Sequence, residues 1–174
     1  MRRRLAAQLY SVAALVYALD RVTKVLVEAR LRGHPPIEII PGALELRFTT
    51  NPGGAFGLFG GAAWLFVLAS LVVVIAVVIT SRSLPSTLAA VSLGLVLGGA
   101  LGNLTDRIIR GPGFSGEVVD FIDLQVWPVF NVADSAIVVG AALLLLSSLR
   151  REPAEGEEAA GGAARRPRSP AAPD

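Results

Sequence analysis

Residues 62–80 read AAWLFVLASLVVVIAVVIT, a continuous apolar stretch without a charged side chain. A helix of this length rises about 28 Å, close to the roughly 30 Å thickness of the hydrocarbon core of a bilayer. Three other stretches are also free of charge, between Arg4 and Asp20, between Arg82 and Asp106, and between Asp134 and Arg150. Four such stretches in 174 residues predict an all-α membrane protein with four transmembrane helices, over roughly 5–22, 62–80, 86–104 and 130–149.

The composition agrees with this class and excludes several kinds of chemistry. Charged residues make up 17% of the chain, against about 25% in soluble domains, and the mean hydropathy is +0.60. The chain has no cysteine and a single histidine, His34, which excludes thiol catalysis, disulfides and a multi-histidine metal centre. A net charge of +2 with scattered basic residues gives no support to nucleic-acid binding. Carboxylates therefore remain for acid–base catalysis, and we expect no metal, no cofactor and no obligate protein partner.

Residues 33–60 differ from the apolar stretches on either side. Five glycines and prolines between 33 and 42 break helical periodicity, and residues 37–40 and 44–49 show strand-like alternation. This pattern predicts a small β element over roughly 36–56, outside the membrane between the first and second helices. Residues 1–151 are expected to form one membrane domain. The Ala-, Gly-, Pro-, Glu- and Arg-rich residues 152–174 predict a disordered tail that the activity does not need.

The first apolar stretch has two interpretations. Its basic start and the small-residue pattern at 16–18 are compatible with a cleaved secretory signal. However, the apolar spacing of a helix continues through 20–27, which favours a retained helix that carries Asp20 and Lys24 one turn apart.

Polar residues collect at one end of the four predicted helices. Because the helices alternate in direction, one membrane face receives Asp20, Lys24, Asn51, Asn103, Asp106, Arg107, Asn131 and Asp134. Asp134 is separated from Arg150 by 15 intervening residues, about 22 Å of helix, which places it at or below the edge of the apolar layer. An ionisable side chain at that depth is costly and marks a candidate functional site.

Asp120 is the natural partner of Asp134, because it lies in the apolar strip 118–124. Two carboxyl groups in a poorly hydrated place can share one proton, and the ionised one can then activate water. Simpler interpretations are that Asp134 caps the fourth helix and that Asp120 is a solvated loop residue. Similarly, Asp106 with Arg107 can be a salt bridge that holds a helix end, and Asp20 with Lys24 can be an interfacial ion pair of little consequence. Asp123 is expected at the surface.

Five segments resemble the bacterial lipoprotein signal peptidase (signal peptidase II) family. In order along residues 20–135 they are DRVTK from Asp20, NPGGAF from Asn51, GGALGNLTDR from Gly98, VVDFID from Val118 and FNVADS from Phe130. The resemblance implies an aspartic endopeptidase that removes the signal peptide from diacylglyceryl-modified prolipoproteins, cutting before the lipidated cysteine. It implies Asp120 and Asp134 as the catalytic pair. It further implies that residues orienting this pair or binding substrate are Asn51, Asn103, Arg107, Asn131, Asp20, Lys24 and Asp106.

The same resemblance implies a location in the cytoplasmic membrane among lipids, with the β element and the active site at the extracytoplasmic face. The even number of predicted spans puts both termini on one side, which is expected to be cytoplasmic. Arginines at 2–4, 82, 150 and 151 flank the proposed cytoplasmic ends. Two features depart from the family pattern: a GPGFSG insert at 111–116, and Pro52 and Gly54 after Asn51.

Two other functions compete with a peptidase. A proton-coupled transporter would use Asp134 as a proton relay and Asp106 with Arg107 as a gate, but it predicts polar groups throughout the membrane depth. A non-enzymatic assembly protein would use the small-residue face of Gly94, Gly98 and Gly102 to bind partner helices.

Overall fold

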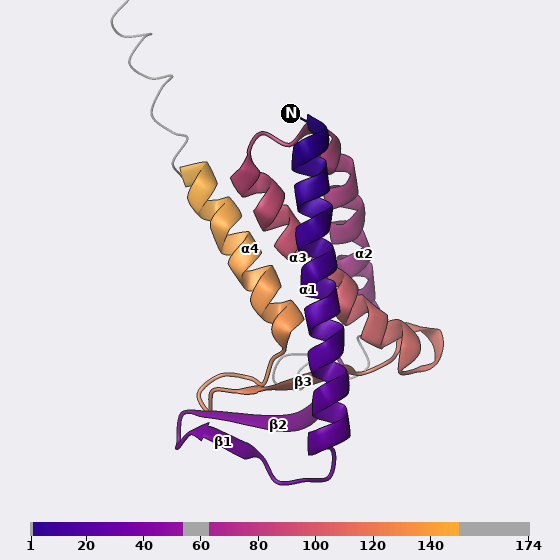
Figure 1. The fold of residues 1–174 in the computed structure, drawn as a ribbon. Coiled ribbons are helices and arrows are strands. Elements are labelled where there is room, and N and C mark those ends of the chain that lie inside the picture. The colour runs from indigo at the N-terminus through magenta and orange to yellow at the C-terminus, as the bar shows by residue number, and fades with distance from the viewer. Residues whose placement is uncertain (1, 54–62, 150–174) are drawn as a thin grey trace, which may run out of the picture.

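The structure is a computed structural model that describes residues 2–53 and 63–149. Within these residues it contains four α-helices and a three-stranded sheet (Figure 1). Residues 54–56 of the predicted β element and the predicted tail at 152–174 lie outside the described part. The elements are α1 Arg2–Leu31, β1 Ile37–Ile40, β2 Leu44–Asn51, α2 Ala63–Thr80, α3 Thr87–Ile109, β3 Val118–Asp123 and α4 Val132–Leu149.

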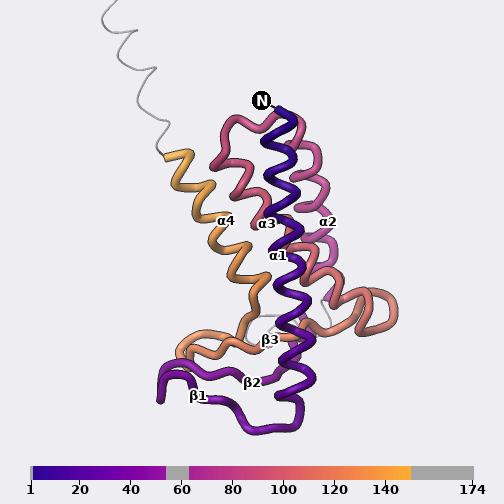
Figure 2. Tube along the Cα trace, viewed as in Figure 1, coloured from indigo at the N-terminus to yellow at the C-terminus, as the bar shows by residue number. Residues whose placement is uncertain are grey.

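The helices run side by side, and the sheet lies across one end of them (Figures 1 and 2). The start of α1 and the end of α4 lie at the opposite end from the sheet. Helix α3 is central, because it packs against α1, α2 and α4. The buried core includes Leu5 and Leu9 of α1, Val77 of α2 and Leu97 of α3.

Glycines allow α3 to approach its neighbours closely. A Cβ at Gly98 would lie 2.6 Å from the carbonyl oxygen of Ala13 and 2.7 Å from Cβ of Val16, both on α1. On the other side, a Cβ at Gly140 of α4 would lie 2.6 Å from the carbonyl oxygen of Ser92. The small-residue face predicted from the sequence is therefore occupied inside the bundle by α1, so it is not available to a partner helix.

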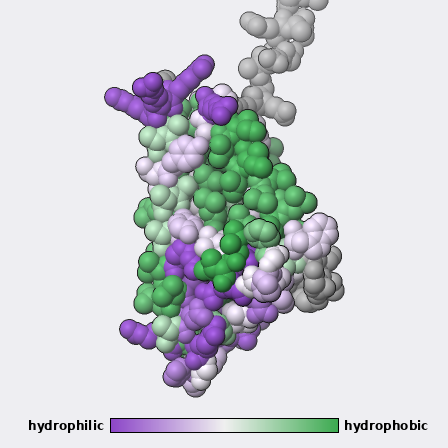
Figure 3. Space-filling model, turned by 90° about the vertical axis from the view of Figure 1, so that its right-hand side faces the viewer, coloured by the Kyte–Doolittle hydropathy of each residue, from purple (hydrophilic) through white to green (hydrophobic). Residues whose placement is uncertain are grey.

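Three of the described helices are long and apolar enough to cross a membrane. They are α2 with its following turn (Ala63–Ser83), α3 and α4. On the face shown in Figure 3, a broad hydrophobic region lies between two hydrophilic ends, as expected for a protein embedded in a bilayer. Helix α1 is longer than these three, but Asp20, Arg21 and Lys24 interrupt its apolar character, and it is not among them.

The sheet has the antiparallel order β1–β2–β3. The sequence predicts the segments that form β1 and β2 but not β3, which comes from the connection between α3 and α4. Residues Val118–Phe121 are all buried, so the strand lacks the alternation of apolar and polar residues by which a half-exposed strand is predicted. Asp120 therefore lies in a strand, and its interpretation as a solvated loop residue is wrong.

A bulge in β2 sets which side chains face Asp120. Leu46 pairs with Ile122, whereas Thr49 pairs with Asp120, so two residues of β2 lie opposite one residue of β3. Paired residues point to the same face of a sheet, and the extra residue shifts the alternation by one. Asn51 thus shares the face of Asp120, although strict alternation from Leu46 would put it on the opposite face.

The 111–116 insert folds against the end of α3. It contains a 3₁₀ turn at Pro112–Phe114, and the N–H of Gly116 donates to the carbonyl oxygen of Arg107 at 3.1 Å. The chain thereby reverses direction after α3 and enters β3 beside the end of the helix.

Candidate active site

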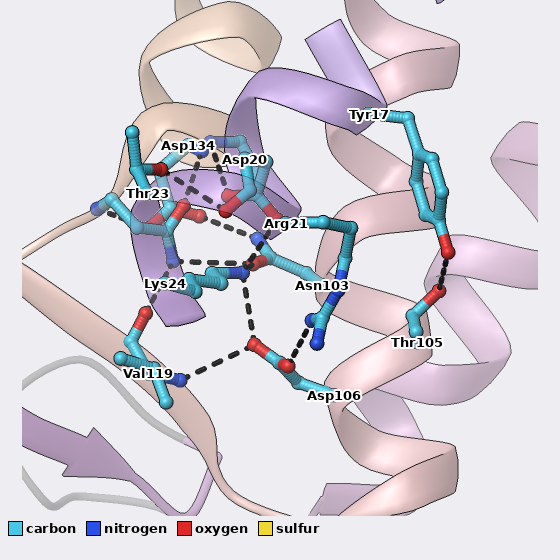
Figure 4. A network of polar contacts seen from close by, with 12 residues as sticks. Tyr17, Asp20, Arg21, Thr23, Lys24, Asn103, Thr105, Asp106, Val119 and Asp134 are labelled. Atoms are coloured by element: carbon cyan, nitrogen blue, oxygen red, sulfur yellow. Dashed lines mark hydrogen bonds and ion pairs between the residues drawn. The ribbon is translucent and has the colours of Figure 1, made fainter. Parts of the chain in front are cut away.

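The predicted polar residues come together where the helices meet the sheet, and Figure 4 shows Asp20, Lys24, Asn103, Asp106 and Asp134 among them. They come from helices α1, α3 and α4 and strands β2 and β3, so the tertiary fold assembles the group. Their positions are Asp20 and Lys24 on α1, Asn51 on β2, Asn103, Asp106 and Arg107 on α3, Asp120 on β3, Asn131 just before α4 and Asp134 in its first turn.

Asp134 is held by the start of α4 and by α3. Asn131 and Asp134 cap the helix reciprocally: Asn131 Oδ1 accepts from the Asp134 N–H at 2.9 Å, and Asp134 Oδ2 accepts from the Asn131 N–H at 3.3 Å. The other carboxylate oxygen, Oδ1, accepts from Nδ2 of Asn103 at 2.7 Å. Asp134 therefore caps α4 with one carboxylate oxygen and binds Asn103 of α3 with the other.

Asp120 is buried and accepts from two asparagines. Its Oδ1 accepts from Nδ2 of Asn131 at 2.6 Å, and its Oδ2 accepts from Nδ2 of Asn51 at 3.2 Å. Burial and, to a smaller extent, the negative charge of Asp134 raise the pKa of Asp120 to about 7, although the two asparagine hydrogen bonds and the charge of Lys24 lower it. A carboxyl group with this pKa can hold a proton at neutral pH.

Two asparagines connect the carboxyl groups. Nδ2 of Asn131 lies 3.1 Å from Oδ1 of Asn103 as well as 2.6 Å from Asp120. The amide of Asn103 in turn donates to Asp134. The order Asp120, Asn131, Asn103, Asp134 therefore forms a continuous hydrogen-bonded path.

A buried ion cluster supports this path from the side of α1. The Nζ of Lys24 lies 2.9 Å from an Oδ2 of both Asp20 and Asp106, and these three side chains have no exposed surface. Asp106 also pairs with Arg21 and with Arg110. Hence Asp20 and Lys24 are not an interfacial pair.

Arg107 turns away from its neighbour Asp106, with which it forms no ion pair among the described contacts. Its guanidinium lies 5.2 Å from the ring centre of Phe66 on α2, and Nη1 is buried without a hydrogen-bond partner among the described residues. The interpretation of Asp106 and Arg107 as a salt bridge is therefore wrong. Arg107 instead offers a buried donor at the edge of the site.

A cavity of about 410 Å³ opens beside the two carboxyl groups. Its polar end contains Asn51, Asn103, Arg107, Asp120 and Asp134. The apolar part lies between helices and includes Phe66, Ala69, Ser70 and Val73 of α2, Val96 and Ala100 of α3, and Ile137 of α4. The arrangement suits a ligand with one apolar part in the membrane and one polar part beneath the sheet.

The end of β3 and the turn after it contain residues near the site that the sequence did not indicate as site residues. Trp127 lines the cavity, and two-thirds of its surface is exposed. Asp123, expected at the surface, is buried: its Oδ2 lies 2.7 Å from Nε of Arg47, and its Oδ1 accepts from the N–H of Gln125 at 2.8 Å. Gln125 has φ of 63°, so Asp123 stabilises a turn in the left-handed region. The Asp–x–Gln spacing was the available signal for such a turn.

The described residues contain no group of three or more His, Cys, Asp or Glu side chains placed to hold a metal ion. What the site does contain is a pair of connected carboxyl groups, one of them with a pKa near neutrality, facing a cavity with amide and guanidinium donors. Such a set can carry out general acid–base catalysis on a carbonyl group.

Comparison with known protein families gives one consistent match. A family model described as signal peptidase (SPase) II covers residues 12–150. The lipoprotein signal peptidase of Rhodococcus jostii is 49% identical over 134 residues, which are 76% of this chain and 68% of that protein. The lipoprotein signal peptidase of Syntrophomonas wolfei is 50% identical over 127 residues, which are 72% of this chain and 82% of that protein.

Solved structures give a matching fold. A bacterial membrane enzyme determined by the in meso method at 2.3 Å resolution superposes with a TM-score of 0.73 at 29% identity, over 87% of this chain and 93% of that one. A second bacterial membrane enzyme, at 1.9 Å resolution, gives a TM-score of 0.72 at 30% identity, over 83% and 94%.

Proposed function

Because the chain belongs to the signal peptidase II family, we propose that it is an aspartic endopeptidase with Asp120 and Asp134 as its catalytic pair. Family membership makes the protein a membrane-embedded peptidase that removes signal peptides from lipoproteins. Beyond family membership, we propose a catalytic mechanism, the residues of the site, the exact substrate and the membrane topology.

One observation carries the proposal. Asp120 and Asp134 come from different elements, are bridged by Asn131 and Asn103, and are the only acidic side chains among the described residues that line the cavity. Structural carboxylates in a protein core usually pair with a cation, as Asp20 and Asp106 do with Lys24. The pair at the cavity instead receives mainly amide donors, which leaves it able to exchange protons.

The hydrogen bonds suggest different roles for the two carboxyl groups. Both oxygens of Asp134 accept N–H donors, which hold the carboxyl group in place, and we assign it the role of general base. Asp120, whose pKa is raised to about 7, holds the proton as general acid.

In the proposed reaction Asp134 removes a proton from water while the water oxygen bonds to the scissile carbonyl carbon. Asp120 protonates the carbonyl oxygen, giving a tetrahedral diol. Collapse of the diol breaks the C–N bond, the leaving amine takes the proton from Asp134, and a diol hydroxyl returns a proton to Asp120. Arg107 and Asn51, which line the same end of the cavity, donate to the developing oxyanion.

The substrate is a prolipoprotein whose cysteine already carries diacylglycerol, and cleavage occurs just before this residue. Such a substrate is anchored by an apolar signal segment and by acyl chains, so the scissile bond lies near the edge of the bilayer. The cavity has apolar walls between α2, α3 and α4 and a polar end beside the sheet, which fits a substrate of this form.

For the topology we propose four membrane spans with α1 as the first. Leu5, Leu9 and Ala13 of α1 belong to the same buried core as α2 and α3, so the first half of α1 lies at the depth of the hydrophobic region. The sheet is then extracytoplasmic, and the chain begins and continues beyond α4 on the cytoplasmic side of the cytoplasmic membrane. The charged residues at 20–24 do not oppose this placement, because Asp20 and Lys24 are buried against protein.

A proton-coupled transporter requires polar groups along a path through the membrane. Among the described residues the buried charged side chains gather instead at the sheet end of the bundle. The structure therefore gives this alternative no support.

The proposal is tested with the full chain purified in detergent and a diacylglyceryl-modified lipobox peptide. We expect cleavage before the lipidated cysteine by the wild type and a loss of at least about 1,000-fold in Asp120→Asn and in Asp134→Asn, since each removes one proton-transfer group. An Asp123→Asn variant is the matched control, because Asp123 is a buried aspartate on the same strand that does not line the cavity. Retained cleavage in either dyad variant, in protein with unchanged thermal unfolding, would refute the mechanism.

A further inference from the structure

Lys24 is the only lysine of the chain, against fifteen arginines. It lies at the centre of the candidate site with no exposed surface. Its ammonium group contacts three acceptors at 2.9 Å each: Oδ2 of Asp20, Oδ2 of Asp106 and Oδ1 of Asn103. The contact with Asn103 is a hydrogen bond, and the contacts with the two aspartates are ion pairs, an arrangement that suits a compact ammonium group among oxygen atoms on different sides.

Each of the three side chains also makes a second contact, either with a proposed catalytic residue or with the residue just before one. Oδ1 of Asp20 accepts from the N–H of Ala133, the residue before Asp134, at 3.1 Å. Oδ2 of Asp106 accepts from the N–H of Val119, the residue before Asp120, at 3.3 Å.

The third acceptor, Asn103, contacts a catalytic side chain directly, because its Nδ2 donates to Oδ1 of Asp134 at 2.7 Å. Through these three side chains, Lys24 is linked to the backbone just before Asp120, to the backbone just before Asp134 and to the side chain of Asp134 (Figure 4).

We propose that Lys24 is a positioning residue of the peptidase, which sets the separation of the two catalytic carboxyl groups and the direction of the Asn103 amide. This inference rests on the proposed function. It assigns Lys24 a role in catalysis without contact to the substrate, since Lys24 does not line the cavity.

The direction of the Asn103 amide follows from charge. Lys24 can only donate, so it fixes Oδ1 of Asn103 on its own side and leaves Nδ2 for Asp134. Without Lys24 the amide can rotate and present its oxygen to Asp134, which then needs a proton to make a hydrogen bond. Arginine cannot replace lysine here, because a planar guanidinium is larger and does not direct three donors to acceptors on three sides.

The charge of Lys24 also acts on the dyad. The charged groups around it are Asp20 and Arg21 on α1, Asp106, Arg107 and Arg110 on α3, Asp120 on β3 and Asp134 on α4. Lys24 lowers the pKa of Asp120, so its removal raises that pKa further. A variant without the cation should therefore work best at a higher pH than the wild type.

The test compares Lys24→Met and Lys24→Arg with Arg21→Gln in the full chain, using the lipidated peptide. Arg21 is the matched control: it lies on the same helix and pairs with Asp106, but it is partly exposed and forms no contact with Asn103 among the described contacts. We expect kcat to fall about 100-fold in both Lys24 variants with KM within about threefold, because misplacement by about 1 Å affects the chemical step. The pH profile of residual kcat should move up by about one unit in Lys24→Met, which removes the cation, but not in Lys24→Arg, and Arg21→Gln should change kcat by less than about threefold.

A purely structural role would lower the folded fraction and leave kcat per folded molecule and the pH profile unchanged, and that result would overturn the inference.

If the Lys24 variants do not fold, the wild type still provides a test, because lysine labelled with ¹⁵N at Nζ gives a single side-chain signal. We expect a charged, slowly exchanging ammonium whose signal shifts in Asn103→Ala; a rapidly exchanging or unshifted signal would contradict the proposal. Failure of the Lys24 prediction in an enzyme that cleaves and needs both aspartates would leave the proposed function intact.

Discussion

Gly102 connects helix packing to the candidate site, so its replacement tests whether the buried cluster matters for activity. A Cβ at this position would lie 2.5 Å from Oδ2 and 3.0 Å from Cγ of Asp20. Carbon–oxygen contacts normally begin near about 3.3 Å, so Gly102→Ala must displace the Asp20 carboxylate by about 0.8 Å. Asp20 Oδ1 lies 3.1 Å from the Ala133 nitrogen, and a shift of that size breaks the bond next to Asp134.

We therefore expect kcat of Gly102→Ala to fall by about 10- to 100-fold, since a displacement below 1 Å is transmitted to a catalytic side chain. Gly94→Ala is the matched control, because its Cβ meets the carbonyl oxygen of Leu9 at 2.6 Å on the same pair of helices, far from the site. Both variants should lose thermal stability in detergent, but only Gly102→Ala should lose activity per folded molecule. Equal loss of activity in the two variants, or wild-type kcat in Gly102→Ala, would refute the reasoning.

Other predictions concern the dyad and the turn beside the cavity. Burial raises the pKa of Asp120 from 3.8 to about 7, so the folded state binds a proton more tightly than the unfolded state and stability falls as pH rises from about 4 to about 7. Asp120→Asn should thus be inactive yet gain melting temperature relative to wild type between pH 4 and pH 8; a constant difference would contradict the raised pKa. Trp127→Ala should raise KM about tenfold with little change in kcat, since this side chain lines the cavity without touching the carboxyl pair, and steady-state kinetics that show the reverse pattern would exclude this. Asp123→Ala should lower the unfolding temperature more than Arg47→Ala, because Asp123 is buried and caps the Gln125 turn, whereas Arg47 is 45% exposed.

Much of the fold follows from local sequence patterns. The charge-free stretches predicted helices in the regions where α2, α3 and α4 lie, and the alternation at 37–49 predicted the strands β1 and β2. In both cases the information is local, the length of an apolar stretch for the helices and a period of 2 residues for the strands.

Features that depend on distant residues could not be predicted in this way. Strand β3 is buried on both faces, and the bulge in β2 inverts the alternation just before Asn51. Asp123 seemed a surface residue because its partner Arg47 is far away in the sequence. The composition of the site could be predicted, since polar residues at membrane depth are rare, but its connections could not: the sequence gives no indication that Asp106 pairs with Lys24 in preference to Arg107.

The spacing of Asp20 and Lys24 has a consequence for the synthesis of the protein. Helix α1 emerges long before α3, which supplies Asp106 and Asn103, so during membrane insertion Lys24 has neither of these partners. A single charged residue within an inserting helix costs about 2.5–3.5 kcal/mol at its centre. Asp20 and Lys24 lie one helical turn apart at 2.9 Å, so α1 itself supplies a counter-ion that offsets the charge of Lys24 until α3 is inserted.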